Sequence, residues 1–227
     1  MARTKHAPER RADALSRERI VDAAIELLDH EGEDGLTFRS LATRLATGPG
    51  AIYWHIKNKD ELLAAASDVV VARALADVGG HATPKKAIRS IALGVFETID
   101  AHPWVGIELA RHPPPTAMLR IFERIGRQVQ ALRARRDTQF TATMVLGSYI
   151  ISESRQNAAN ARVQDPAPDR ADFLEKIAAR WKELDADEFP FTREVANQLR
   201  EHDDRAEFLA GIDLILAGIA AGSAGSR

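Results

Sequence analysis

Residues 36–59 contain two short helical patterns separated by a break, and this segment limits the possible folds more than any other. The first pattern opens at Thr37, a plausible N-cap, and repeats apolar residues at helical spacing: Phe38, Leu41, Ala42 and Leu45. The sequence Thr-Gly-Pro-Gly at positions 47–50 cannot continue that helix. A second, shorter apolar face follows at Ala51, Ile52 and Ile56. The segment is therefore predicted to fold as a helix, a tight turn and another helix.

Three ring-bearing residues, Tyr53, Trp54 and His55, lie between the two isoleucines of the second face. At least two of these rings must point outward, because Ile52 and Ile56 already occupy the inner face of so short a helix. A helix that exposes aromatic rings after a Gly-containing turn is typical of a helix-turn-helix unit, whose second helix enters a DNA major groove. The alternative, in which Tyr53 and Trp54 both belong to the core, stays open at this point.

Three motifs extend the pattern: Ala-Ala-Ile-Glu-Leu-Leu at 23–28, Gly-Leu-Thr-x-Arg-x-Leu-Ala-x-x-Leu at 35–45, and Ile-Tyr-Trp-His-Ile-Lys-Asn-Lys at 52–59 with Leu-Leu at 62–63. Together they resemble the tetracycline-repressor (TetR) family, and within it the tetracycline repressors themselves. A weaker likeness to the last helix of those repressors covers residues 208–218. The resemblance implies an all-α protein, with a three-helix helix-turn-helix DNA-binding domain followed by a larger helical ligand-binding and dimerisation domain.

The resemblance also implies which side chains meet double-stranded operator DNA. The residue matching Arg39 reads a guanine, and a guanidinium suits that base because it can bond O6 and N7 together. Residues matching Tyr53, Trp54 and His55 touch phosphates and thymine methyl groups, and the one matching Lys59 binds phosphate at a helix N-terminus. The tetracycline repressors have Gln, Pro and Thr where this chain has Pro49, Gly50 and Ala51, so a different operator is expected. The predicted DNA-contacting residues are Thr37, Arg39, Pro49, Gly50, Ala51, Tyr53, Trp54, His55 and Lys59.

The charge distribution is uneven, although the formal net charge of −2 gives no global indication of a nucleic-acid partner. Residues 1–19 carry six bases and three acids, and residues 36–60 carry four bases and one acid. Residues 20–35, between them, carry six acids and no base. A fold that turned this acidic segment away would leave a locally positive face toward DNA. Chance clustering on a solvated surface explains the charges as well.

The composition argues against several other classes of protein. The chain has no cysteine, so disulfides and thiolate metal sites are excluded, which fits a reducing compartment. The N-terminus lacks the apolar region of a signal peptide, and the longest apolar run, residues 208–222, is too short to span a membrane. The pair His202 and Asp203 lacks the further ligands of a metal phosphohydrolase, and no catalytic motif is visible. We therefore expect a cytoplasmic protein that is not an enzyme, with no metal, no cofactor and no membrane partner.

The rest of the chain indicates helices, because its apolar residues repeat at spacings of three and four and no strand pattern persists. Helices are expected at about residues 16–35, 59–78, 84–101, 116–136, 137–160, 173–181 and 205–221, with shorter ones after 102 and around 193–200. Thr116 is the expected cap of the fourth of these. We expect a disordered basic arm at 1–15, the DNA-binding domain at 16–62, and the ligand-binding and dimerisation domain at 63–227.

The larger domain of TetR proteins holds a pocket for a small-molecule inducer, and this chain offers apolar lining residues. The predicted lining is Leu75, Ile91, Val95, Phe96, Trp104, Met118, Phe122, Met144, Tyr149 and Gln156. The positions that grip magnesium-bound tetracycline in the repressors fall on Leu75, Ile91, Val95, Ala110, Pro113 and near Gln156, which cannot build that polar site. The resemblance thus implies a larger, more apolar or non-chelated ligand. An ordinary place in the core is the alternative for each residue.

Small residues on two long helices suggest a homodimer. In the family these helices pair with their mates in a four-helix bundle, and the residues expected at the interface are Gly147, Ser148, Gly211, Leu214 and Gly218. Two recognition helices are also needed to meet two half-sites about one helical turn apart. The alternative is that the small residues pack within one subunit.

The sequence as a whole favours a ligand-responsive DNA-binding transcriptional repressor, a homodimer that binds a palindromic operator and is released by a small, mainly apolar molecule. Two alternatives remain: an all-α interaction or adaptor protein without operator specificity, and an enzyme acting on an apolar ligand. Salt dependence of duplex binding separates the first reading from the others, because phosphate contacts release counterions.

Overall fold

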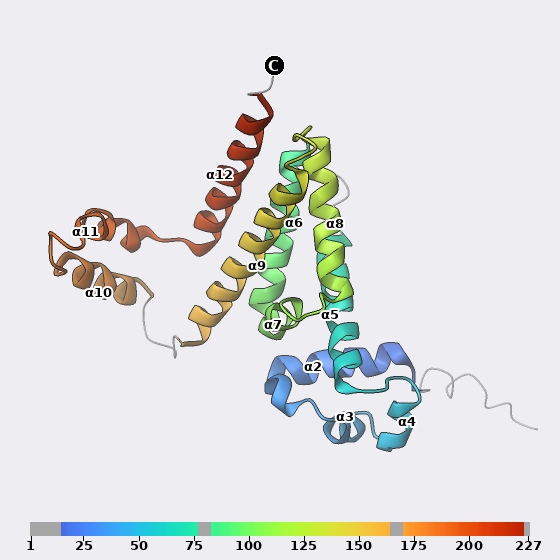
Figure 1. The fold of residues 1–227 in the computed structure, drawn as a ribbon. Coiled ribbons are helices and arrows are strands. Elements are labelled where there is room, and N and C mark those ends of the chain that lie inside the picture. Colours follow the sequence, from blue (N-terminus) through green and yellow to red (C-terminus); the bar gives the residue numbers. More distant parts are fainter. Residues whose placement is uncertain (1–14, 77–82, 164–169, 225–227) are drawn as a thin grey trace, which may run out of the picture.

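The computed structural model describes residues 15–76, 83–163 and 170–224, and every regular element in these ranges is a helix, as predicted (Figure 1). The N-terminal helices are α2 (Arg17–Gly35), α3 (Phe38–Arg44) and α4 (Pro49–Tyr53). The remaining ones are α5 (Lys59–Ala76), α6 (Pro84–Ala101), α7 (Pro103–Leu109), α8 (Thr116–Ala131), α9 (Gln139–Val163), α10 (Arg170–Lys182), α11 (Pro190–Val195), the 3₁₀ helix η2 (Ala196–Glu201) and α12 (Asp204–Ala224). The predicted basic arm lies outside the described residues, apart from Leu15.

Capping side chains determine where the N-terminal helices α2 and α3 begin. Ser16 caps α2 by accepting a hydrogen bond from the backbone N–H of Arg19 at 3.2 Å. Thr37 and Ser40 form a capping box at the start of α3, in which each side chain accepts from the other residue's backbone N–H at 3.0 Å. Thr37 is the cap that the sequence predicted for α3, and short-range contacts of this kind fix where α2 and α3 begin.

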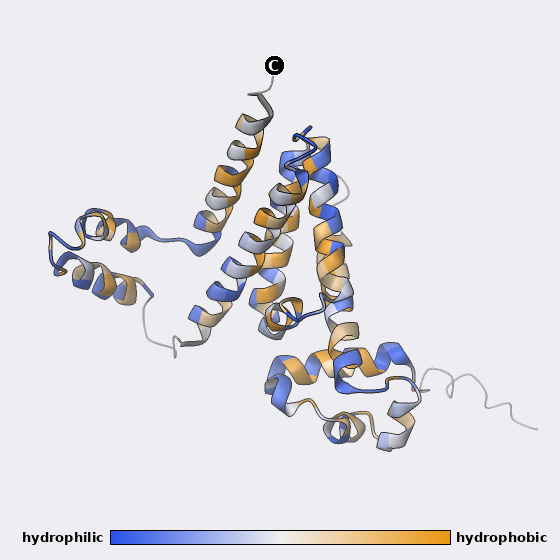
Figure 2. Ribbon diagram, viewed as in Figure 1, coloured by the Kyte–Doolittle hydropathy of each residue, from blue (hydrophilic) through white to orange (hydrophobic). Residues whose placement is uncertain are grey.

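The larger part of the molecule is a helical bundle above the N-terminal helices. In Figure 1, α5 rises out of the N-terminal domain, α6, α8 and α9 stand beside it, and α12 runs along α9. Apolar residues line the inner faces of these helices (Figure 2), and the fully buried ones include Ile88, Ile91, Ile121 and Ile150. The core continues without interruption from α2 into α9. Burial of this continuous apolar surface is the main stabilisation of the bundle.

Helices α10 and α11 with η2 form an arm that stands to one side of the bundle (Figure 1). Its three elements pack on one another around Leu174, Ala178 and Ala196. Among the described residues, no helix is both long and apolar enough to cross a membrane.

Several predicted helix boundaries were wrong. Thr116 is the first residue of α8 and Pro115 occupies the cap position, while the helix ends at Ala131 and not at about residue 136 as predicted. Arg133 follows with a positive φ of 57°, which no α-helix accommodates. The short helix predicted around residues 193–200 begins earlier, at Pro190, because proline is well suited to the first turn, and it continues as the 3₁₀ helix η2.

Candidate functional site

The isoleucines of α4 and the loop after it are buried, and the rings between them are exposed. Ile52 and Ile56 have no exposed surface, whereas Tyr53 is 53% and Trp54 90% exposed, and His55 is exposed as well. The alternative in which Tyr53 and Trp54 are both core residues is therefore wrong. Proline at the first position of α4 needs no hydrogen-bond partner, which allows so short a helix to begin directly after the turn.

The two exposed aromatic rings differ in how they are held. Tyr53 stacks on Phe38 of α3, with ring centroids 4.3 Å apart and planes inclined by 4°. The Trp54 side chain reaches almost entirely into solvent from the C-cap of α4. Two neighbouring aromatic rings are thus exposed together at this short helix, and adjoining exposed apolar groups are typical of an interaction surface.

The other predicted DNA-contacting residues lie around this helix. Arg39, Pro49 and Gly50 are exposed and Ala51 is half-buried. Thr37 is exposed, although its hydroxyl is engaged in the capping box of α3. Lys59 is half-buried and its Nζ donates to the backbone carbonyl of Glu33, so a phosphate contact requires this bond to be exchanged.

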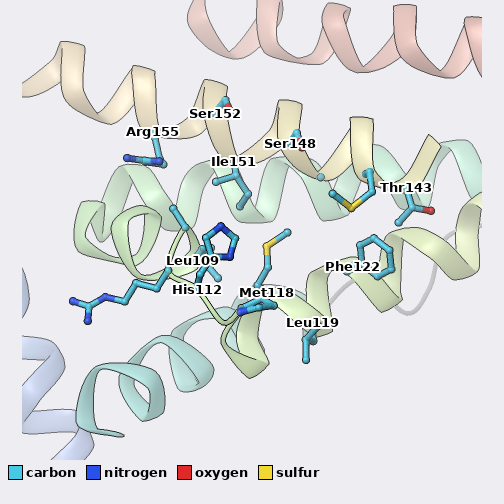
Figure 3. Close-up of a pocket in the computed structure, with 15 residues that line it drawn as sticks. Leu109, His112, Met118, Leu119, Phe122, Thr143, Ser148, Ile151, Ser152 and Arg155 are labelled. Atoms are coloured by element: carbon cyan, nitrogen blue, oxygen red, sulfur yellow. The ribbon is translucent and has the colours of Figure 1, made fainter. Parts of the chain in front are cut away.

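A cavity of about 510 Å³ lies between the end of α7, the following loop, α8 and α9 (Figure 3). Three of the predicted pocket residues, Met118, Phe122 and Met144, come together in its wall. Figure 3 shows His112 and Met118 pointing from the loop and α8 toward Ile151 of α9. The full lining is Leu109, Ala110, Arg111, His112, Pro114, Met118, Leu119, Phe122, Thr143, Met144, Gly147, Ser148, Ile151, Ser152 and Arg155.

The other predicted pocket residues do not line this cavity. Leu75, Ile91 and Val95 are buried in the core, and Trp104 is buried with its indole N–H on Asp29. A second hollow of about 450 Å³ is lined by Phe96, Tyr149 and Gln156, together with residues of α12 and of the loop before it. The predicted set therefore divides between the cavity, the core and this second hollow.

The loop residues of the cavity, Arg111 and His112 among them, were missed by the sequence analysis. Arg111 forms three ion pairs: Nη2 lies 2.7 Å from Glu33 Oε1, Nη1 lies 3.2 Å from Asp60 Oδ1, and Nε lies 2.7 Å from Glu108 Oε2. Glu33 belongs to α2 and Asp60 to the first turn of α5. The same side chain thus lines the cavity and contacts α2 and α5, the helices that precede and follow the helix-turn-helix pair α3 and α4.

The electrostatics of this cluster favour a charged guanidinium. The hydrogen bond to Glu33 raises the pKa of Arg111, and burial raises the pKa of the Glu108 carboxyl while Arg111 opposes that shift. Glu108 is 5% exposed, so without Arg111 its charge would be buried with no counterion among the described residues. A second contact joins the same parts: Asp29 of α2 accepts from Trp104 Nε1 at 2.8 Å and lies 2.7 Å from His102 Nδ1.

The residues expected at a dimer interface have different surroundings. Gly147 is buried, and a Cβ at this position would lie 3.8 Å from Met118 Cε. Ser148 and Gly218 are exposed, and Leu214 is 75% exposed. A Cβ on Gly211 would lie 1.9 Å from Tyr149 Oη, so Gly211 packs against its own subunit.

Across the described ranges, no group of three or more His, Asp or Glu side chains is arranged to hold a metal ion.

Comparison with known proteins agrees with this architecture. Residues 20–66 match the family described as "Bacterial regulatory proteins, tetR family". The structure of SCO7222, a TetR transcriptional regulator of Streptomyces coelicolor, is 51% identical over 92% of this chain and 100% of its own, with a TM-score of 0.83. ActR of the same organism, solved with (S)-DNPA, is 25% identical over 92% of this chain and 98% of its own, with a TM-score of 0.74.

Curated relatives point the same way. An HTH-type transcriptional regulator of Saccharopolyspora erythraea is 28% identical over 91% of this chain and 85% of its own length. The class D tetracycline repressor of Escherichia coli is 49% identical over 59 residues, which are 26% of this chain and 27% of that protein. The exposed rings at α4 and the cavity in the larger domain agree with these similarities. The chain therefore belongs to the TetR family of ligand-binding, DNA-binding transcriptional regulators.

Proposed function

We propose that this chain is a repressor that binds a palindromic operator as a homodimer and leaves it when a small, mainly apolar molecule enters the cavity between α7, α8 and α9. The observation that carries the proposal is Trp54, which is 90% exposed on a helix anchored by two fully buried isoleucines. Such a helix presents its rings to a groove while its own position stays fixed by the core.

The proposed base and phosphate contacts follow from the exposed side chains around α4. Arg39 reads a guanine through its two parallel N–H groups, and Tyr53, Trp54 and His55 meet phosphates and thymine methyl groups. Lys59 exchanges its bond to the Glu33 carbonyl for a phosphate. Pro49, Gly50 and Ala51 bring the backbone close to the bases, with no long side chain there to read them.

Two copies of the chain are proposed to pair through α9 and α12. Support comes from apolar side chains that these helices leave in solvent: Phe140 is 69% exposed, Met144 44%, Val145 47% and Leu214 75%. Covering such a surface removes apolar area from water. Ser148 and Gly218 lie on the same helices and permit close approach. Gly211 takes part less directly, since it packs on Tyr149.

The inducer is proposed to be different from magnesium-bound tetracycline. Leu75, Ile91 and Val95 are buried and apolar at the positions that hold the drug in the tetracycline repressors, and the cavity wall is built mainly from aliphatic, thioether and aromatic groups. Titration with magnesium and tetracycline should give no binding. Micromolar affinity would refute this part of the proposal.

The test is selection of bound sequences from a random duplex library, followed by titration of the selected duplex at several salt concentrations. We expect a palindrome with two half-sites and an affinity that falls steeply with salt. Trp54→Ala should weaken binding with no loss of stability, because the side chain packs on little. Phe191→Ala, which removes a 71% exposed ring from α11, is the matched control and should leave the affinity unchanged. The absence of any enriched sequence would favour an interaction protein without operator specificity.

A further inference from the structure

The lining of the cavity between α7, α8 and α9 has an uneven charge. Among the residues that the structure describes, the lining holds two arginines and a histidine, Arg111, His112 and Arg155, and no Asp or Glu. The remainder is apolar or carries a hydroxyl or a backbone amide. An anionic group would find donors here, whereas a cationic group would find no counterion, and the wall would bury an apolar body.

The arginines are held at the cavity by neighbouring elements. The stem of Arg155 on α9 lies against α7, since a Cβ on Gly106 would be 2.7 Å from Arg155 Cγ. The guanidinium of Arg111 turns all three of its nitrogens to carboxylates: Nη2 to Glu33, Nη1 to Asp60 and Nε to Glu108. An anion in the cavity would therefore compete with these three acids for the guanidinium.

We propose that the inducer is an amphipathic organic anion, an aromatic or polycyclic acid, and that its acidic group competes with Glu33 and Asp60 for Arg111. The inference rests on the proposed function and names the ligand class and the switch of that same site. Glu33 and Asp60 lie on the helices of the DNA-binding unit, so losing Arg111 breaks a link between that unit and the cavity loop. The three acids would then repel one another, which favours separation of the loop from α2 and α5.

Linkage makes the proposal testable without DNA. If Glu33 and the anion compete for one guanidinium, removing the Glu33 charge must strengthen anion binding, because coupling between two sites is reciprocal. Glu33→Gln is thus expected to raise the affinity for an anionic ligand and to leave a neutral ligand unaffected. Glu26→Gln is the matched control, since Glu26 is also on α2 and also in an ion pair, with Arg44.

The probes are 8-anilino-1-naphthalenesulfonate and N-phenyl-1-naphthylamine, which share one aromatic body and differ by the sulfonate. Both change fluorescence in an apolar site, so each is titrated into the full-length protein. Wild type should bind the sulfonate about tenfold more tightly than the neutral amine, as one charge-assisted hydrogen bond predicts. Met118→Trp, which narrows the cavity, should weaken both probes and so locate them.

Two further variants test the contributions of Arg155 and Arg111 to anion binding. Arg155→Met should weaken the sulfonate by about tenfold and leave the neutral amine unchanged. The double variant Glu108→Gln with Arg111→Met should do the same, and the added glutamine avoids leaving a buried carboxylate without its cation. Each variant is checked for an unchanged circular dichroism spectrum and unfolding midpoint before titration.

The proposal is overturned by any of three results: no sulfonate binding in the cavity, equal affinity for the two probes in wild type, or equal responses of Glu33→Gln and Glu26→Gln. A failure of the proposed function looks different. In that case no duplex is enriched from the library, while the probe titrations still report whether the cavity selects anions. If an operator is found, the sulfonate should lower the affinity of wild type for it, and less so in the Arg155→Met variant.

Discussion

Phe38 of α3 and Tyr53 of α4 stack face to face, with ring centroids 4.3 Å apart and planes inclined by 4°. The contact joins the two helices of the helix-turn-helix unit at a surface that faces solvent, since Tyr53 is 53% exposed. Tyr53 is thereby held in one orientation before any partner binds. A partner that uses this ring does not have to order it, and the stack therefore acts as preorganisation.

We predict that Phe38→Ala weakens operator binding by up to about tenfold, because an aromatic pair contributes roughly 0.5–1.5 kcal/mol beyond its buried area. Phe38→Tyr keeps a ring in the same place and is the control. The measurement is titration of the selected duplex with each variant, alongside the unfolding midpoint. Unchanged affinity for Phe38→Ala would mean that the stack plays no part in presenting Tyr53.

Substitution of Arg39 tests whether this side chain reads the base sequence of the operator directly. The side chain is exposed in the first turn of α3. Arg39→Ala should cost about 1–3 kcal/mol on the best duplex and relax the preference at one base position. Titration on duplexes substituted at each position measures this. An equal loss on every duplex would instead make Arg39 a phosphate contact.

Local features of the fold could be predicted because they depend on neighbours in the sequence. Ser16 and Thr37 cap their helices with partners three residues away, and the spacing of Ile52 and Ile56 left no room for Tyr53 and Trp54 on the inner face of α4. These are consequences of helix geometry alone. They account for the success of the sequence in identifying the helix-turn-helix unit.

The loop side of the cavity, with Arg111, could not be predicted, because it depends on residues far apart in the sequence. Arg111 meets Glu33 and Asp60 across 78 and 51 positions of sequence, and no periodicity marks such a pairing. The loop after α7 contains three consecutive prolines at 113–115, which show where a helix must stop but not where the loop lies in the fold. Leu75, Ile91 and Val95, which the alignment assigned to the ligand site, are buried and do not line the cavity between α7, α8 and α9.

Two glycines of α12, Gly211 and Gly218, have different surroundings, and substituting each one tests packing within a subunit and packing between subunits. A Cβ on Gly211 would lie 1.9 Å from Tyr149 Oη and 2.4 Å from Cζ, whereas one on Gly218 would meet no described atom within 4 Å. Gly211→Ala should lower the free energy of unfolding by about 1–3 kcal/mol, the usual cost of overpacking. Gly218→Ala should instead raise it by up to about 1 kcal/mol, because alanine is favoured over glycine inside a helix, and should weaken dimerisation if α12 pairs across the dimer.

Denaturant unfolding and sedimentation measure these two effects separately. Adding Tyr149→Ala to Gly211→Ala should restore part of the lost stability, because the two changes share one clash and are not additive. Equal destabilisation by both glycine substitutions would contradict the assignment of Gly211 to the interior of the subunit.

The carboxyl of Asp68 makes the free energy of unfolding depend on pH, and the direction of this dependence can be predicted. Burial raises the pKa of this carboxyl, and Arg120, 3.9 Å away through Nε, only partly offsets the shift. Because the pKa is higher in the folded than in the unfolded protein, the ionised group lowers stability at neutral pH. That penalty disappears as the pH falls through the raised folded value toward the unfolded one. Asp68→Asn should therefore stabilise the protein at pH 7, by less than about 1 kcal/mol given partial solvent screening.

The pH profile of the unfolding free energy tests this sign directly. The gap between wild type and Asp68→Asn should close as the solution is acidified into the range where carboxyls titrate. Asp137→Asn is the control of opposite sign, since the hydrogen bond from Arg135 lowers the pKa of Asp137, and its stabilising contribution is lost as pH falls through that lowered value. If both variants changed stability in the same direction at pH 7, burial of Asp68 between α5 and α8 would not be the source of the effect.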